Sequence, residues 1–100
     1  MHFKNFKRTS KIGDNMCYVY ILECADKSLY TGWTVNLDNR LKKHNEGKAS
    51  KYTRTRLPVK LVYYETYESK IDAQKREWNI KKLSRREKLV LINKNCSISR

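Results

Sequence analysis

The sequence has too few metal-ligating side chains for most metal centres. It holds three cysteines and two histidines in 100 residues, and their spacing matches no zinc site. Cys17 and Cys24 stand at an odd separation on one predicted strand, so their side chains point to opposite faces and cannot form a disulfide within it. We therefore expect reduced, structural cysteines.

Long apolar runs are also absent. No run approaches the ~20 residues that span a bilayer, and residues 1–15 contain no apolar segment of the kind found in signal peptides. We therefore expect a cytoplasmic chain with no membrane partner. Hydrophobic residues make up 39% and aromatic residues 11% of the chain, which is enough for the small core of one domain.

Acidic residues are scarce beside basic ones. Ten Asp and Glu stand against 23 Lys and Arg, which gives a formal net charge of +13. An excess this large disfavours a compact state and favours a polyanionic partner, with nucleic acid before an acidic membrane surface. The composition therefore points to a protein that contacts phosphate groups.

The pattern of hydrophobic residues, turns and caps predicts one folded unit. Residues 1–15 are interpreted as a flexible basic arm, 16–95 as the domain and 96–100 as a frayed tail. The expected elements are strands over 18–23 and 29–33, a helix capped by Thr34 or Asn36 and closed by Gly47, a basic loop over 48–58, a strand over 60–67, a helix from 69 or 70 to about 82, and a helix from a capping box at 84–87 to about Asn93. The order β-β-α-β-α-α places the fold in the α+β class with a small antiparallel sheet.

Two predicted helices carry ionisable residues on the side that the pattern assigns to the core. Leu37 and Leu41 mark the apolar stripe of the first helix, and Arg40 and His44 border it. Glu77 lies on the apolar side of the later helix. Charged residues are seldom buried unless they are paired. Either these groups form a site, or Arg40 and Glu77 form a structural ion pair.

Five positions agree in type and spacing with a known family. The motif residues are Tyr18-Val19-Tyr20, Tyr30-Thr31-Gly32, Arg40, His44 and Glu77. Together they resemble the GIY-YIG nuclease superfamily, above all its small stand-alone bacterial members, over roughly residues 16–92. Tyr18 and Val19 replace the first glycine and isoleucine of the motif, and Thr31 replaces the second isoleucine, which affects packing more than chemistry.

The resemblance implies a fold and a site. The fold is a three-stranded antiparallel sheet flanked by three helices, and the site is a metal-dependent phosphodiesterase centre on the sheet surface. The residues carried over as catalytic are Tyr20, Tyr30, Arg40, His44 and Glu77, with Gly32 as a structural motif residue and Glu77 as the metal ligand. A further family asparagine matches either Asn93 or Asn95, and that assignment stays open.

The chemistry of phosphodiester hydrolysis suggests a role for each group. Glu77 suits Mg²⁺, with Mn²⁺ as an alternative, and the absence of other acids around it in the pattern favours one metal ion over two. Arg40 suits a non-bridging phosphate oxygen. Tyr30 is the expected proton acceptor and Tyr20 the residue that positions water, while His44 shares in the proton transfer or orients the water.

Basic and aromatic residues around these positions are candidates for nucleic-acid contacts. The expected contacts are Lys48, Lys51, Tyr52, Arg54, Arg56, Arg76 and Lys81. The alternative for the cations is an ordinary solvated surface, and Tyr52 and Trp33 fit either base stacking or the core. Trp78 is predicted to be a core residue.

Three functions fit the sequence. The first is a metal-dependent DNA endonuclease that selects structure rather than sequence, with DNA repair or recombination as the expected role and RNA still open as a substrate. The second is a catalytically silent nucleic-acid-binding module of the same fold. The third is a domain that docks on an acidic protein. The sequence decides neither the oligomeric state nor whether a partner protein supplies targeting.

Overall fold

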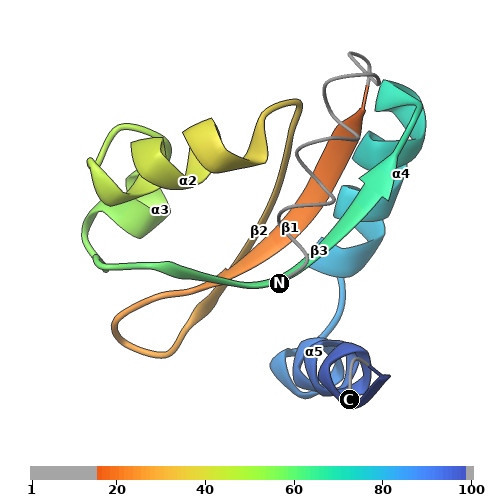
Figure 1. Cartoon of the computed structure of the whole chain (residues 1–100). Helices are drawn as coiled ribbons and strands as arrows, with labels where there is room; N and C mark the ends of the chain where they lie inside the picture. Colours follow the sequence, from red (N-terminus) through yellow and green to blue (C-terminus); the bar gives the residue numbers. More distant parts are fainter. Residues whose placement is uncertain (1–15, 99–100) are drawn as a thin grey trace.

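The computed structural model describes residues 16–98, with side chains through residue 94, as one α+β unit (Figure 1). The expected basic arm of residues 1–15 lies outside the described residues. The elements are β1 (Cys17–Glu23), β2 (Leu29–Thr34), α2 (Leu37–Asn45), α3 (Lys51–Arg54), β3 (Lys60–Tyr67), α4 (Lys70–Lys81) and α5 (Arg85–Ile98). No helix in this part of the chain is long and apolar enough to cross a membrane.

The sheet is antiparallel, with strand order β2-β1-β3, as the sequence predicts. In the β1–β2 register, Tyr20 pairs with Gly32 and Leu22 pairs with Tyr30. The hairpin between these strands closes with a backbone hydrogen bond from Cys24 N to Ser28 O of 2.9 Å. Because β1 is central, β2 is an edge strand, and its residues reach an open margin of the sheet.

Both faces of the sheet are covered, and this explains the nearly continuous apolar run of β1. Val19 and Ile21 pack against Ala73 and Ile80 of α4. The other face belongs to a second cluster, in which Tyr18, Tyr20 and Leu22 of β1 pack with Leu37 of α2 and Val59. Figure 1 shows α2 and α3 on one side of the sheet and α4 on the other. The two described cysteines, Cys17 and Cys24, are buried in opposite clusters and form no disulfide with each other.

Side-chain caps begin the helices where the sequence predicts them. Asn36 accepts from Asn39 N at 3.0 Å to start α2, and Ser69 accepts from Asp72 N at 3.3 Å to start α4. The capping box of α5 is formed in both directions, with Ser84 N to Glu87 Oε1 at 2.9 Å and Glu87 N to Ser84 Oγ at 3.1 Å. Gly47 follows α2 with a φ of +77°, the left-handed backbone that favours glycine after a helix.

Two helix predictions are wrong in extent. The basic segment predicted as a loop contains the one-turn helix α3, whose cap Ser50 accepts from Thr53 N at 3.1 Å. A single turn is too short to show helical periodicity in a sequence. The last helix was expected to end near Asn93, but α5 continues to Ile98 and therefore into the expected tail. No glycine or proline stands in that stretch to end it.

A charged cluster joins β3 to α4. Glu65 accepts from Arg76 Nε at 2.9 Å and from Arg76 Nη2 at 3.0 Å, and it also accepts from the hydroxyls of Tyr63 and Tyr67. Burial alone would raise the pKa of Glu65, but the hydrogen bonds from Arg76 and the two tyrosines outweigh burial and hold this pKa below its ordinary value. The cluster therefore favours the ionised carboxylate and orients α4 against the sheet.

Candidate active site

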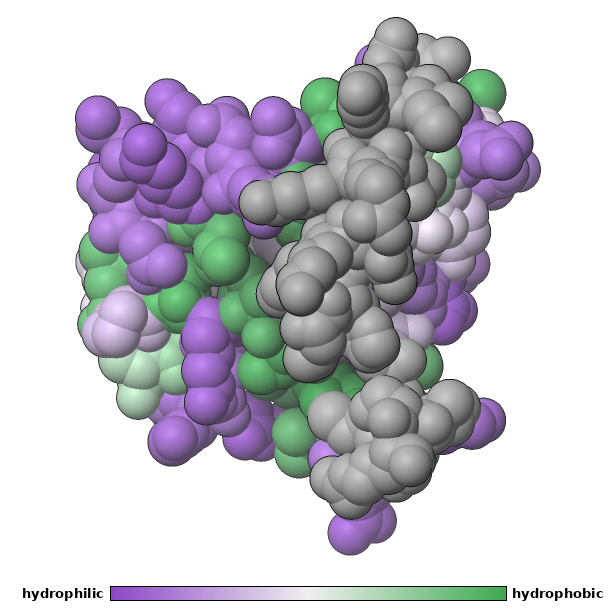
Figure 2. Space-filling view, viewed as in Figure 1, coloured by the Kyte–Doolittle hydropathy of each residue, from purple (hydrophilic) through white to green (hydrophobic). Residues whose placement is uncertain are grey.

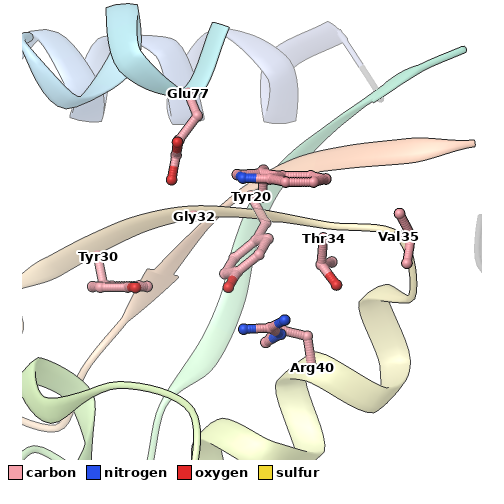
Figure 3. Close-up of a pocket in the computed structure, with 8 residues that line it drawn as sticks. Tyr20, Tyr30, Gly32, Thr34, Val35, Arg40 and Glu77 are labelled. Atoms are coloured by element: carbon pink, nitrogen blue, oxygen red, sulfur yellow. The ribbon is translucent and has the colours of Figure 1, made fainter. Parts of the chain in front are cut away.

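A cleft of about 320 Å³ lies at the β2 edge of the sheet. Arg40 reaches it from α2 on one face of the sheet, and Glu77 reaches it from α4 on the other (Figure 3). Tyr20 of β1 and Tyr30 of β2 lie between them. The lining comprises Tyr20, Tyr30, Gly32, Trp33, Thr34, Val35, Arg40 and Glu77. The structure thus brings together four of the five predicted catalytic residues and Gly32.

The strand register explains why the two tyrosines meet. Tyr30 stands two residues before Gly32, the partner of Tyr20, so both side chains point to the same face on diagonal positions. Gly32 has no side chain, and the Tyr20 hydroxyl uses that space. A Cβ atom added to Gly32 would lie 2.6 Å from Tyr20 Oη and 2.7 Å from Tyr20 Cζ. The close approach therefore requires glycine at this position.

His44 does not line the cleft but lies behind it. Its side chain is 1% exposed. His44 Nε2 is 2.9 Å from Tyr20 Oη, and His44 Nδ1 is 2.8 Å from Thr53 Oγ1. The edge of its ring also meets the Tyr30 ring at a centroid distance of 5.2 Å. This position suits a residue that orients the two tyrosines better than one that contacts water in the cleft.

Burial sets the ionisation of both His44 and Tyr20. It lowers the pKa of His44 to about 4, with a further contribution from the Arg40 charge, so the imidazole is neutral at physiological pH. Burial also raises the pKa of Tyr20, and the neighbouring Tyr30 adds to the effect. Tyr20 therefore keeps its proton and acts through hydrogen bonds.

The depressed pKa of His44 makes folding depend on pH. The unfolded imidazole titrates near 6.5 and the folded one near 4, so the unfolded state binds more protons between these values. Stability is therefore fully present above pH 6.5 and is lost as the pH falls towards 4. We expect the free energy of unfolding to fall by about 2 kcal/mol between pH 7 and pH 5 through this group.

Urea unfolding at a series of pH values measures the loss. The His44→Gln variant should lack this part of the slope, while the His2→Gln variant, which removes the other histidine of the chain, should keep it. An unchanged slope in His44→Gln would show that His44 is not held neutral by burial.

Arg40 and Glu77 do not form the ion pair that was the alternative to a site. The ion pair of Glu77 is with Lys81, one turn later on α4, at 3.2 Å. Arg40 forms no ion pair with any residue of the described part of the chain. Its guanidinium points towards Tyr20 in Figure 3 and is free to bind an anion in the cleft.

Tyr52 and Arg56 form one wall beside the cleft. The Tyr52 ring stacks on Tyr30 with centroids 5.9 Å apart and an interplanar angle of 22°. The Arg56 guanidinium lies 3.9 Å from the Tyr52 ring centroid and also pairs with Asp26 at 3.1 Å. Tyr52 is 38% exposed, so it is not a core residue. The stack holds Tyr30 in place from its outer side.

Comparison with known proteins identifies the family of this chain. Residues 16–90 match the family model of the GIY-YIG catalytic domain. The chain belongs to the GIY-YIG family. It is 63% identical over 78 residues to a UPF0213 protein of Clostridium perfringens, which covers 78% of this chain and 84% of that protein. It is 61% identical over 79 residues to a UPF0213 protein of Syntrophus aciditrophicus, which covers 78% and 91% respectively.

Two solved structures confirm the fold class. The solution NMR structure of a UPF0213 protein from Bacillus halodurans matches with a TM-score of 0.52 at 50% identity, over 78% of this chain and 83% of that one. The solution NMR structure of a protein from E. faecalis matches with a TM-score of 0.55 at 37% identity, over 79% of this chain and 84% of that one.

The GIY-YIG domain is a nuclease domain, so membership of the family supports a nuclease that acts on DNA.

GIY-YIG nucleases generally use a divalent metal ion, and the cleft has donors that fit one. Among the described residues, no three His, Cys, Asp or Glu side chains gather as a ligand group. Glu77 alone supplies a carboxylate to the open cleft. Mg²⁺ usually keeps several waters and accepts one or two protein carboxylates, so a single carboxylate fits it. Lys81 competes with such an ion for Glu77.

The predicted nucleic-acid contacts divide into free and engaged cations. Lys48, Lys51 and Arg54 line a second hollow of about 380 Å³ next to Gly47 and Ser50. Lys51 and Arg54 form no ion pair within the described residues, whereas Lys48 Nζ lies 3.9 Å from Glu46 Oε1. Three others are held by carboxylates: Arg56 by Asp26, Arg76 by Glu65 and Lys81 by Glu77. Hydrophilic side chains gather over the α2 side of the molecule in Figure 2. A backbone-phosphate surface is therefore best developed around α2 and α3.

The structure also changes the reading of residues outside the motif. Trp78 was predicted in the core but is 61% exposed, with Lys82 Nζ 3.8 Å from its ring centroid. The helical phase of Ala73 and Ile80, the buried residues of α4, directs Trp78 outwards.

Thr53 is fully buried and hydrogen-bonded to His44, and no sequence pattern identified it. Asn93 is exposed on α5 and does not line the cleft, and the Asn95 side chain lies outside the described residues.

Proposed function

We propose that this chain is a divalent-metal-dependent endonuclease that hydrolyses phosphodiester bonds in DNA and selects branched or damaged structures rather than a sequence. DNA repair or recombination is the matching role. The main support is the cleft at the β2 edge, where a carboxylate from α4, a guanidinium from α2 and two tyrosines from the sheet converge. These are the groups needed for a metal ion, a phosphate and an attacking water.

Glu77 and Arg40 both serve to stabilise the negative charge of the phosphate, Glu77 through a metal ion and Arg40 by direct contact. Glu77 would hold Mg²⁺ or Mn²⁺, and such an ion, when bound, stabilises charge on the phosphate oxygens and lowers the pKa of a bound water. Arg40 binds a non-bridging oxygen through its planar fork. The two residues approach from opposite faces of the sheet, so the scissile phosphate lies across the edge strand between them.

Tyr30 is the proton acceptor in this proposal, and Tyr20 positions the water. Burial disfavours the ionised form of Tyr20, and the buried neutral His44 holds its hydroxyl in one orientation. Tyr30 is less buried and opens to the cleft, which Arg40 also lines. Each tyrosine therefore has a task that fits its surroundings.

Removing one hydroxyl at a time distinguishes the two roles. We expect Tyr30→Phe to lower kcat by about 10²- to 10⁴-fold, the range of a general base. Tyr20→Phe should lower kcat less, because water can still enter the cleft. Single-turnover cleavage at several pH values measures both, with Tyr67→Phe, which does not line the cleft, as the control. A larger loss in Tyr20→Phe, with Tyr30→Phe nearly normal, would move the acceptor role to Tyr20.

Trp78 adds an exposed aromatic surface on α4, the helix that carries Glu77. It follows Glu77 on α4, and Lys82 covers its ring with a positive charge. An exposed aromatic side chain with neighbouring cations is typical of surfaces that stack unpaired bases. This surface favours substrates with single-stranded segments over intact duplex.

Tryptophan fluorescence in EDTA tests this contact without any turnover. Single-stranded oligonucleotide should quench the emission, and Trp78→Phe should remove most of the quenching. Trp78→Ala should weaken single-strand binding by about 5- to 150-fold, since stacking contributes ~1–3 kcal/mol per base. Ile71→Ala, equally exposed on the same helix, should leave binding unchanged. Undiminished quenching in Trp78→Phe would assign the contact to Trp33 instead.

A panel of oligonucleotides tests the proposed function. Purified protein is incubated with flap, fork, junction, duplex and single-stranded substrates of DNA, and with RNA counterparts, in Mg²⁺, Mn²⁺ or EDTA. We expect metal-dependent incision of branched DNA. Incision of duplex at one sequence, or of RNA alone, would contradict the proposed substrate class.

A second candidate is a nucleic-acid-binding module without turnover. The ion pair between Lys81 and Glu77 favours it, because the ammonium occupies the carboxylate that would hold the metal ion. Salt-sensitive binding without incision in any metal ion would support this candidate. Incision by the Lys81→Ala variant, with none by the wild type, would show that this pair silences the site.

A further inference from the structure

A buried chain of hydrogen bonds runs from the cleft to the basic segment around α3. Tyr20 Oη meets His44 Nε2 at 2.9 Å, and His44 Nδ1 meets Thr53 Oγ1 at 2.8 Å. Thr53 Oγ1 in turn lies 3.4 Å from the Ser50 carbonyl oxygen and 3.3 Å from Ser50 Oγ. His44 and Thr53 are at most 1% exposed, so water does not supply them with alternative partners, whereas the Tyr20 side chain lines the cleft.

The number of protons in this chain allows only two arrangements. The neutral imidazole has one N–H donor and one bare nitrogen, and each hydroxyl has one proton. In the first arrangement, His44 Nδ1–H donates to Thr53, Thr53 donates to Ser50, and the Tyr20 hydroxyl donates to Nε2. In the second, Thr53 donates to Nδ1, and Nε2–H donates to Tyr20. In the first arrangement the Tyr20 hydroxyl proton points towards His44, and in the second arrangement it points into the cleft.

We propose that Thr53 is a positioning residue that holds His44 as the Nδ1–H tautomer, so that Tyr20 presents an acceptor lone pair to the cleft. Two hydroxyls compete to donate to the one bare imidazole nitrogen, and a phenol is a stronger hydrogen-bond acid than an aliphatic alcohol. Thr53 has another acceptor within reach, the Ser50 carbonyl, whereas Tyr20 has no other acceptor within this chain of hydrogen bonds. Both facts favour the first arrangement.

The consequence for the proposed nuclease concerns the attacking water. With its lone pair in the cleft, Tyr20 accepts a hydrogen bond from that water and orients it, and Tyr30 remains free to take the proton. This consequence rests on the proposed function, whereas the tautomer itself does not. Because Thr53 belongs to α3 between Lys51 and Arg54, the orientation of Tyr20 is also tied to the segment that carries free cations.

NMR of the imidazole nitrogens tests the tautomer directly. In protein with ¹⁵N-labelled histidine, protonated and bare ring nitrogens resonate far apart, and a His2→Gln background leaves only the His44 signals. We expect Nδ1 of His44 to be protonated in the wild-type chain near pH 7 and in Thr53→Ser, which keeps the hydroxyl. In Thr53→Val the proton should move to Nε2, because a buried N–H without an acceptor is costlier than a bare nitrogen.

Two results would overturn the proposal: a wild-type His44 protonated at Nε2, or a Thr53→Val variant that keeps the Nδ1–H form. The measurement with Thr53 intact changes no residue of the buried hydrogen-bond network, so it stands even if Thr53→Val folds poorly.

Cleavage kinetics provide a separate readout. Thr53→Val should lower kcat by about 10- to 100-fold with KM little changed, the range for residues that act through another, and Thr53→Ser should restore it. If the tautomer shifts as expected but no variant or wild type cleaves DNA, the proposed function fails and the role of Thr53 in holding His44 remains. If the tautomer shifts and kcat does not change, Thr53 does not position a group used in the reaction.

Discussion

Glu77→Gln is expected to reduce metal-dependent DNA cleavage by about 10³-fold or more, to the level seen in EDTA. The amide keeps the shape of the side chain but loses the negative charge that a hard cation requires. Loss of the ion removes several kcal/mol of charge stabilisation from the transition state, and each 1.36 kcal/mol corresponds to a tenfold change in rate.

Metal binding can be followed without any substrate. In ¹⁵N-labelled wild-type protein, Mn²⁺ should broaden the backbone amide signals around the cleft, including those of Tyr30, Gly32 and Glu77, and the broadening should vanish in Glu77→Gln. Glu68→Gln removes an exposed carboxylate from the segment just before α4 and should change neither cleavage nor broadening. Normal cleavage by Glu77→Gln would exclude Glu77 as the metal ligand.

Gly32→Ala is expected to damage both stability and the site. The new Cβ would lie 2.6 Å from Tyr20 Oη, so the Tyr20 ring must leave its place and break the 2.9 Å contact with His44. Overpacking of this kind typically destabilises by ~1–3 kcal/mol, and the buried His44 Nε2 loses its partner. We expect cleavage to fall by about 10²-fold, since a displacement of about 1 Å at a site has effects of that size.

A double-mutant cycle tests whether the clash with Tyr20 is the cause. The destabilisation by Gly32→Ala in urea unfolding should become much smaller when Tyr20→Ala is already present, because the side chain that meets the new methyl group is then absent. Equal destabilisation in both backgrounds would show that Gly32 is needed for another reason, such as the backbone of the edge strand.

The sequence predicts the fold well where local signals are strong. The β-branched and aromatic runs of β1 to β3, the cap at Asn36 and the capping box at 84–87 all appear in the structure. The turn of α3 was missed because it depends on one cap, Ser50, and on tertiary contacts of Thr53. The length of α5 was underestimated because the sequence beyond residue 93 lacks a strong stop signal.

The candidate site could be predicted in part. The motif identified four of the residues whose side chains line the cleft, and also Gly32, whose lack of a side chain leaves room for Tyr20. The distances between these side chains could not be inferred from their spacing in the sequence. Arg40 and Glu77 come from opposite faces of the sheet and approach the same cleft only around its edge. The position of His44 behind the tyrosines and its bond to Thr53 depend on three-dimensional packing.

Trp78 shows a different limit of sequence reasoning. A tryptophan in a small domain is more often buried than exposed, and that expectation outweighed the helical phase set by Ala73 and Ile80. The phase was the better guide, because α4 buries only one narrow stripe against the sheet and leaves the rest of its surface open.

Conversion of supercoiled plasmid to the nicked form by the purified wild-type chain is the most direct test of a nuclease centre at the β2 edge. We predict nicking in Mg²⁺ or Mn²⁺, none in EDTA, and none by Glu77→Gln or Arg40→Gln, with all three proteins binding the plasmid at low salt. Nicking by Glu77→Gln at the wild-type rate, or binding without nicking in every metal ion tested, would contradict a catalytic role for this cleft.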